Sequence, residues 1–388
     1  RASVPRAARS AAADRIVAMT EARMVSVIIP VRNRPVLLGE AVASVLAQTY
    51  RPIELGIVDD STDATVAVIG ELVRAHPDVI SVRRQDGRGI GAARNIGLAA
   101  ARGEFIQFLD SDDLLMPEKF ARQVAGLRAH PDCGISYCAA REYRVLAEPA
   151  DAAARRSGGA LTHLFPALLR GRIWPSPSPL YRRAVTEAVG AFVHSPKYED
   201  WEYEARAGAL QVRLHHCPEL LADKRDAHHL EGRRKGGVPL RQAGDHADVV
   251  LSVYESARRA GVTADALTVF APRLLAAGRV CAAANDIERA RRCVGLAVAH
   301  ASPGRRGRFE IYQWLSTQLG WRLVGAIAER SVRSARAAWR ARRWPVAGYH
   351  RWQHRRRRAR QIIAGQPVTR WPGLLTHAWN NRRSRREL

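Results

Sequence analysis

The chain has 388 residues, of which 47% are hydrophobic and 26% are charged, and its formal net charge at pH 7 is +25. This length suits two domains at the usual ~100–200 residues each, and the composition is that of a globular protein rather than a disordered one. No apolar run reaches the ~18 residues that a membrane-spanning helix needs.

The first residues and the cysteines bear on the compartment. Arg1–Arg23 has no continuous apolar core, which argues against a secretory signal peptide. Met24 directly precedes the first predicted strand, so we expect residues 1–23 to be a disordered extension or to lie ahead of the true start. The five cysteines are scattered without metal-site spacing, which predicts reduced thiols in a cytoplasmic protein.

Short apolar runs alternate with segments of helical spacing over the first part of the chain. Strands are predicted at Val25–Val31, Ile53–Val58, Val79–Val82 and Phe105–Leu109. The helices between them are predicted at Val36–Gln48, Thr65–Ala75 and Ala92–Ala101. Strands that alternate with helices of this length form βαβ units. The pattern therefore predicts an α/β fold with a mostly parallel, doubly wound sheet.

The predicted strand Phe105–Leu109 ends abruptly in three carboxylates, Asp110, Asp112 and Asp113. The carboxyl edge of an open α/β sheet is where such folds bind ligands. Carboxylates crowded there repel one another unless a cation lies between them, and hard divalent cations prefer oxygen ligands. We interpret the cluster as a site for a cation that bridges the protein to a diphosphate. The alternative is that Asp112 or Asp113 only caps the helix expected near Met116–Glu118.

Beyond Asp113 the alternation becomes less regular. A helix is predicted over Glu118–His130 and a strand over Gly134–Ala140. The prolines of Trp174–Pro179 predict a loop, and Glu199–Gly208 has amphipathic helical spacing.

From residue 236 onward the spacing is helical throughout. The predicted helices include Val249–Ala260, Leu267–Ala284, Ile287–Ala299 and Ile311–Ala328. We expect residues 236–330 to form a helical domain and residues 331–388 to form a separate basic tail.

The tail carries most of the net positive charge and most of the tryptophans. Arg355–Arg358 is an unbroken basic cluster beside Trp352. Arginine with interleaved tryptophan fits a segment that lies on an anionic membrane surface. A solvated, disordered tail is the main alternative, and a nucleic-acid partner is a weaker one.

Short sequence blocks in a fixed order add a family resemblance to this interpretation. They are Val25–Pro30 with Asn33, Val58–Asp63, Ala93–Gly97, Phe108–Asp113, Leu180–Arg183, Gly190–Phe192 and Glu199–Trp201. The ordered set resembles the family 2 glycosyltransferases of the GT-A fold over roughly residues 24–230. The resemblance implies a GT-A domain over 24–235, followed by the α-helical C-terminal region.

The resemblance also implies donor-binding residues. Pro30, Val31 and Asn33 would lie at the end of the first strand near the nucleotide base. Asp60 would contact the base, and Arg94 would approach the donor diphosphate. The alternatives are that Asp60 is a turn residue and that Arg94 forms a surface salt bridge.

The remaining implied roles concern the metal and the reaction. Asp110 and Asp112 would form the Asp-x-Asp element, with Asp112 on a Mg²⁺ or Mn²⁺ ion and Asp110 toward ribose and metal; Asp113 would then belong to the helix start. His228 would help hold the metal or diphosphate. Asp200 would be the catalytic base, unless it only caps a helix. Trp201 beside it is more often a core residue than a sugar-stacking one.

These roles predict an inverting, metal-dependent glycosyltransferase. It would move a sugar from a nucleoside-diphosphate sugar to an acceptor hydroxyl, in the synthesis of a cell-envelope polysaccharide, a glycolipid or another glycoconjugate. The alternatives are a nucleotidyltransferase and a non-catalytic nucleotide- or polyanion-binding protein.

Overall fold

The structure is a computed structural model that describes residues 23–144, 153–155, 159–195, 197–226 and 238–343. By its contacts the chain divides into two units, Arg1–Ser334 and Ala335–Leu388, and nearly all of the described residues belong to the first. His228 and the tail beyond residue 343 lie outside the described residues. None of the helices described is long and apolar enough to cross a membrane.

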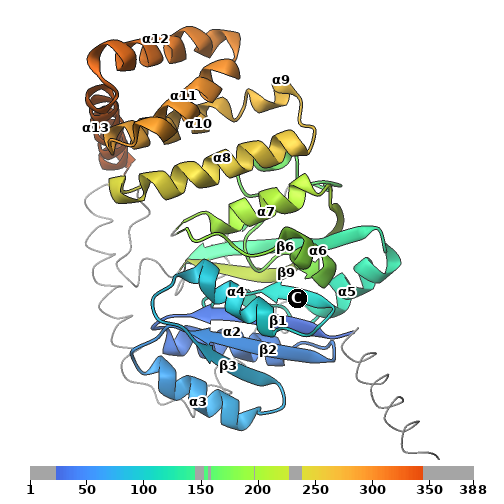
Figure 1. Cartoon of the computed structure of the whole chain (residues 1–388). Coiled ribbons are helices and arrows are strands. Elements are labelled where there is room, and N and C mark those ends of the chain that lie inside the picture. The colour runs from blue at the N-terminus through green and yellow to red at the C-terminus, as the bar shows by residue number, and fades with distance from the viewer. Residues whose placement is uncertain (1–22, 145–152, 156–158, 196, 227–237, 344–388) are drawn as a thin grey trace, which may run out of the picture. The chain divides into compact units, whose positions relative to one another are not determined.

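A nine-stranded sheet runs through this unit (Figure 1). Its strand order is β3-β2-β1-β4-β8-β6-β9-β5, and β7 pairs with β6 off this path. The strands are β1 (Val25–Val31), β2 (Ile53–Asp59), β3 (Ile80–Arg84), β4 (Phe105–Phe108), β5 (Leu114–Leu115), β6 (Cys133–Arg144), β7 (Ala153–Arg155), β8 (Leu180–Arg182) and β9 (Arg213–Asp226).

The two halves of the sheet differ in strand direction. β1 to β4 are mutually parallel, as the alternation of strands and helices predicted. β8 is antiparallel to β4 and β6, and β9 is parallel to β6. The predicted α/β class is confirmed, but the sheet as a whole is mixed. β9 was not predicted, because its many charged residues hide the strand pattern.

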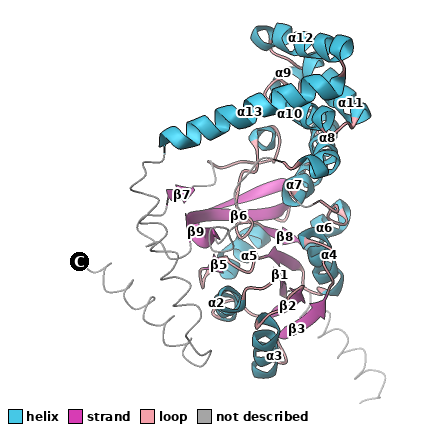
Figure 2. Ribbon diagram, turned by 90° about the vertical axis from the view of Figure 1, so that its left-hand side faces the viewer, coloured by secondary structure: helices cyan, strands magenta, loops and turns pink. Residues whose placement is uncertain are grey.

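Helices cover both faces of the sheet, as Figure 2 shows edge-on. Alternate residues of β1 point to opposite faces: Val27 and Ile29 belong to one apolar cluster and Ile28 to the other. The first cluster takes residues from α2 (Pro35–Leu46), α3 (Thr65–Ala75) and α5 (Lys119–Ala129). On the other face lie α4 (Ile90–Ala100), α6 (Arg183–Val189) and α7 (Glu199–Ala209).

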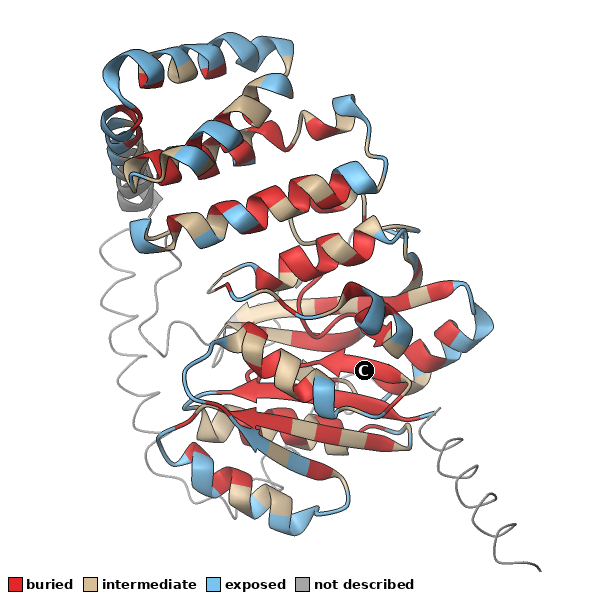
Figure 3. Ribbon diagram, in the orientation of Figure 1, coloured by how far each residue is buried: buried red, intermediate tan, exposed pale blue. Residues whose placement is uncertain are grey.

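The C-terminal helices continue the second cluster. They are α8 (Ala243–Arg259), α9 (Ala264–Leu267), α10 (Ala271–Ala283), α11 (Ile287–Ala299), α12 (Pro303–Leu319) and α13 (Trp321–Arg343). Trp201 of α7 packs on Phe270 just before α10, with ring centroids 5.9 Å apart. A buried band therefore runs from the sheet through α7 into these helices (Figure 3).

Two predicted helices are each divided in the structure. Leu267–Ala284 is split between α9 and α10, and Ile311–Ala328 is split at Gly320. Gly320 has φ +94°, a left-handed conformation that ends α12 and that other residues adopt only with strain. Apolar spacing continues across both breaks, which is why the sequence pattern did not show them.

Candidate active site

The carboxyl ends of β1 and β2 meet at one edge of the sheet. Val31 pairs with Asp59, so both strands end together, and Pro30 and Val31 are buried there. Asn33 follows with φ +55° and joins the two loops: its N–H donates to Ser61 Oγ, and its Oδ1 accepts from the N–H of Thr62, both at 2.9 Å. Asn33 therefore fixes the loops at this edge.

Asp59 and Asp60 point to different partners at the same edge. Asp59 is buried and holds Arg84 at 2.6 Å while accepting from the N–H of Ser61. Asp60 Oδ1 accepts from the N–H of Gly87 at 2.6 Å, which ties the glycine-rich loop after β3 to this edge. Its Oδ2 lies 3.7 Å from Arg32. Asp59 therefore ties the end of β2 to β3, and Asp60 joins the loop after β2 to the loop after β3.

A buried arginine joins the end of β4 to the start of α7. Arg94, on α4, donates to Asp110 at 2.9 Å and to Glu199 at 2.8 Å. Burial alone would raise the pKa of Asp110, but the charges of Arg94 and Lys224 hold it well below its usual range. Burial and the neighbouring Asp200 raise the pKa of Glu199. Arg94 is thus a structural cation between two carboxylates and does not form the exposed salt bridge considered from the sequence.

The other two carboxylates after β4 lie deeper than the sequence indicated. Asp112 lies 3.0 Å from Arg34, and burial raises its pKa while Arg34 opposes that rise. Asp113 is fully buried, and its Oδ1 accepts from the N–H of Arg225 on β9 at 2.8 Å. The prediction that Asp113 belongs to the helix start is wrong, because α5 begins at Lys119. Asp113 meets β9 instead, a strand that the sequence did not predict.

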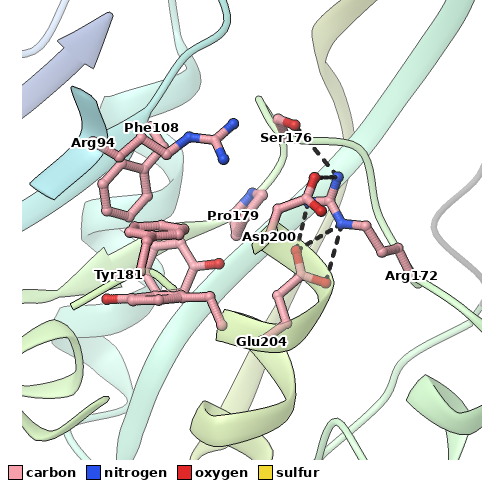
Figure 4. Close-up of a pocket in the computed structure, with 10 residues that line it drawn as sticks. Arg94, Phe108, Arg172, Ser176, Pro179, Tyr181, Asp200 and Glu204 are labelled. Atoms are coloured by element: carbon pink, nitrogen blue, oxygen red, sulfur yellow. Dashed lines mark hydrogen bonds and ion pairs between the residues drawn. The ribbon is translucent and has the colours of Figure 1, made fainter. Parts of the chain in front are cut away.

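Asp200, the predicted base, lies in the first turn of α7 rather than at its cap. Its Oδ1 accepts from the N–H of Trp201 at 2.8 Å, and its Oδ2 lies 2.5 Å from Arg172. Arg172 also binds Glu204 at 2.5 Å and reaches Ser176 at 3.4 Å (Figure 4). Arg172 therefore bridges two carboxylates of α7, much as Arg94 bridges Asp110 and Glu199.

A small pocket separates these two arginines. Asp200, Arg172 and Arg94 contribute to its lining together with aromatic rings of β4 and α7 (Figure 4). Its Tyr203 hydroxyl is buried without a hydrogen-bond partner among the described residues. Trp201 and Trp174 are both buried, which fits core packing rather than sugar stacking.

Several residues of this site were missed by sequence reasoning. Arg172 stands beside the proline-rich loop Trp174–Pro179, and no local pattern marks it as a site residue. Glu202 and Glu204 were expected to be solvated neighbours of Asp200, yet both are buried, as is Glu199. The pKa of Lys224 is raised, first by Asp113 and then by Asp110 and Asp112, although burial opposes the rise. Only the crowding of charges around Lys224 in the sequence hinted at its place.

The end of β4 has ligands that suit a divalent cation. The described residues hold no group of three or more His, Cys, Asp or Glu side chains arranged for a metal ion. Asp110 and Asp112 nevertheless lie close enough for the charge of Asp110 to add to the burial that raises the pKa of Asp112. Two carboxylates suit Mg²⁺ or Mn²⁺ when a diphosphate and water supply further oxygen ligands. The donor set therefore fits a divalent cation shared with a diphosphate.

Part of the sequence is similar to known glycosyltransferases. Residues 26–151 match the family model described as glycosyl transferase family 2. The putative glycosyltransferase EpsH of Bacillus subtilis is 33% identical over 174 residues, which cover 43% of this chain and 49% of EpsH. An uncharacterized glycosyltransferase of Haemophilus influenzae is 38% identical over 102 residues, or 26% of this chain and 41% of that protein. The chain thus spans less than half the length of these curated relatives.

Solved structures extend the likeness beyond the matched segment. The structure of S. aureus TarS 1-349 in complex with UDP-GlcNAc superposes with a TM-score of 0.57 at 18% identity, covering 79% of this chain and 92% of that one. At this identity the likeness concerns the fold. Residues 26–151 therefore match glycosyl transferase family 2, and the fold of the chain is that of the GT-A glycosyltransferases.

Proposed function

We propose that this chain is an inverting glycosyltransferase that moves a sugar from a nucleoside-diphosphate sugar to an acceptor hydroxyl. The observation that carries the proposal is the position of Asp200. It lies in the first turn of α7 and lines the same pocket as Arg94, which pairs with Asp110 at the end of β4. A carboxylate that can take a proton thus lies beside the predicted donor site.

The donor would lie along the carboxyl edge of the sheet. Pro30, Val31 and Asn33 would border the nucleotide base, and Asp60 would contact it from the loop after β2. The TarS structure of the same fold holds UDP-GlcNAc, which supports a nucleoside-diphosphate sugar as the donor class. Arg94 would approach the donor diphosphate and would also hold Asp110 toward the ribose and the metal.

Asp110 and Asp112 would hold a Mg²⁺ or Mn²⁺ ion together with the donor diphosphate. The ion would supply positive charge against the negative charge that develops on the departing diphosphate. Arg34 and Lys224 would offset the negative charge of these two carboxylates between turnovers, because both lie beside them. His228 is proposed as a further ligand from the segment after β9.

Asp200 would accept the proton of the acceptor hydroxyl. The hydroxyl oxygen would form its bond to the anomeric carbon as the bond from that carbon to the diphosphate oxygen breaks on the opposite face. A single displacement of this kind inverts the anomeric configuration. Arg172 would hold the Asp200 carboxylate in a fixed orientation, because the two side chains form an ion pair at 2.5 Å.

The acceptor would belong to a cell-envelope polysaccharide, a glycolipid or a related glycoconjugate, and the enzyme would work in the cytoplasm. The test is incubation with a panel of nucleotide sugars and Mn²⁺ or Mg²⁺, with release of nucleoside diphosphate as the readout. We expect release with at least one donor and a stereochemically inverted product. No binding and no release across the panel would exclude the transferase in favour of a non-catalytic protein.

A further inference from the structure

Large apolar side chains are unusually exposed on the last two helices of the unit. Ile311, Trp314, Leu319, Leu323 and Ile327 are 55% to 60% exposed, whereas the other exposed large hydrophobic residues among those described reach 47% at most. All five lie on α12 and α13, and Leu319 and Leu323 flank the joint at Gly320. We call these five residues the α12–α13 face.

The α12–α13 face takes no part in holding the helices to the rest of the unit. The opposite sides do that: Phe309 of α12 and Trp321 and Val324 of α13 are buried. Gly325 lies against α10 so closely that an added Cβ would meet the Ala283 nitrogen at 2.6 Å. The exposed side chains are therefore extra to the core, and large apolar side chains exposed together on two consecutive helices are candidates for an interaction surface.

Arginines accompany the apolar side chains. Arg308 lies one helical turn before Ile311, and Arg330 lies three residues after Ile327, so each shares the outer side of its helix. Neither forms an ion pair with any described residue. Residues 303–334 contain six arginines and two glutamates, and Glu329 already lies 3.7 Å from Arg279. Glu310 beside Ile311 is also exposed, so this segment has a net positive charge with arginine in excess.

We propose that the α12–α13 face binds an anionic lipid bilayer, with its apolar side chains at the boundary of headgroups and acyl chains and its arginines on lipid phosphates. Apolar side chains flanked by arginine are what such an interface requires. The proposal goes beyond sugar transfer, because it assigns the enzyme a membrane-docking surface formed by ordered helices of the folded unit.

Charge favours lipid over the other occupants. A second copy seated on the same face would bring like charges together, since a two-fold interface sets one patch against its equal. A nucleic acid would meet the arginines, but four of the five apolar residues are aliphatic and offer no ring for bases to stack on. An anionic bilayer satisfies both the charged and the aliphatic side chains.

The test uses the full chain and vesicle co-sedimentation. Wild type should bind vesicles that contain phosphatidylglycerol and should bind pure phosphatidylcholine vesicles much less. The double variant Trp314→Ser with Leu323→Ser should bind at least about tenfold more weakly, because it loses buried apolar area. Arg308→Gln with Arg330→Gln should weaken binding to anionic vesicles about fivefold for each charge removed.

The matched control is Val66→Ser with Leu210→Ser, which removes two exposed apolar side chains from other parts of the unit. It should bind vesicles like wild type. If the Trp314/Leu323 variant binds like wild type, the face is not the docking surface and the basic tail alone accounts for binding. The proposal is equally overturned if wild type ignores anionic vesicles, or if the variant changes the oligomeric state and leaves vesicle binding intact.

Discussion

The end of β4 and the start of α7 both place carboxylates beside arginine. The carboxylates differ in how many cations surround them and in how exposed they are. At β4, Asp110 and Asp112 are surrounded by Arg34, Arg94 and Lys224, and their pKa values are displaced in opposite directions. Such a cluster is suited to hold charged groups in place.

At α7 the surroundings are simpler. Asp200 keeps one cationic partner, Arg172, and is about a quarter exposed. Its neighbours Glu199 and Glu204 are buried and engaged by arginine, so Asp200 is the acid of this turn that an incoming group can reach. The comparison teaches that one region would bind charge while the other would transfer a proton.

The largest expected effect follows from replacing the acid at α7. Asp200→Asn should lower kcat about a thousandfold, the scale of a lost general base, while the donor dissociation constant stays unchanged. Nucleoside diphosphate release and equilibrium donor binding measure the two quantities separately. The control is Asp132→Asn, which removes an exposed carboxylate just before β6, outside the proposed site. Activity close to wild type in Asp200→Asn would remove the distinction between the two regions.

In contrast to Asp200→Asn, replacing a carboxylate at the end of β4 should change donor binding. Asp112→Asn should lower kcat/KM about a hundredfold, because it removes a ligand of the proposed ion. Donor binding should also lose its dependence on Mn²⁺, which titration of donor affinity against metal concentration would measure. Donor binding that responds to Mn²⁺ as in wild type would show that Asp112 does not hold the metal.

Substitution of Arg172 tests whether the proposed role of Asp200 depends on the arginine that pairs with it. Arg172→Gln should lower kcat about tenfold with little change in donor affinity, because Asp200 loses the partner that fixes it. Trp174 still donates to Glu204 at 3.0 Å, which limits the cost to folding. Arg172→Lys should recover part of the loss. Equal weakening of donor binding and kcat, or no recovery with lysine, would indicate a purely structural role.

The smallest effect concerns another buried cation, Lys119, which lies between α5 and β4. Among the described residues, the Lys119 ammonium has the amide oxygens of Gln107 and Gln123 as its hydrogen-bond partners, and burial lowers its pKa from 10.5 to about 8. Between these values the unfolded chain holds a proton that the folded chain has released, so stability rises with pH.

Relative to Lys119→Met, wild type should therefore gain roughly 1 kcal/mol of unfolding free energy between about pH 8.5 and about pH 9.5. Denaturant unfolding of both proteins at each pH measures the difference. A gap that stays constant across this range would mean that Lys119 does not titrate there. In contrast, Arg94 and Arg172 remain charged, because carboxylates raise their pKa values despite burial.

Sequence reasoning was most accurate where chain neighbours determine the outcome. β1, α3 and α11 occupy the predicted residues, because their apolar spacing reports directly on local structure. Asp110, Asp112 and Asp113 lie at the sheet edge for the same reason, because they closely follow the end of β4 in the chain. The domain boundaries, the roles of the site residues and the tail remain predictions.

The sequence by itself determined the α/β class, the parallel half of the sheet and the blocks that resemble family 2 glycosyltransferases, because these depend on short-range patterns. The tertiary structure decided what meets those blocks. Only folding brings Arg172 to Asp200 and β9 to Asp113, across separations that no local pattern encodes. It also decided which acids are buried and which are exposed, since burial depends on how α7 packs on the sheet and how β9 pairs within it.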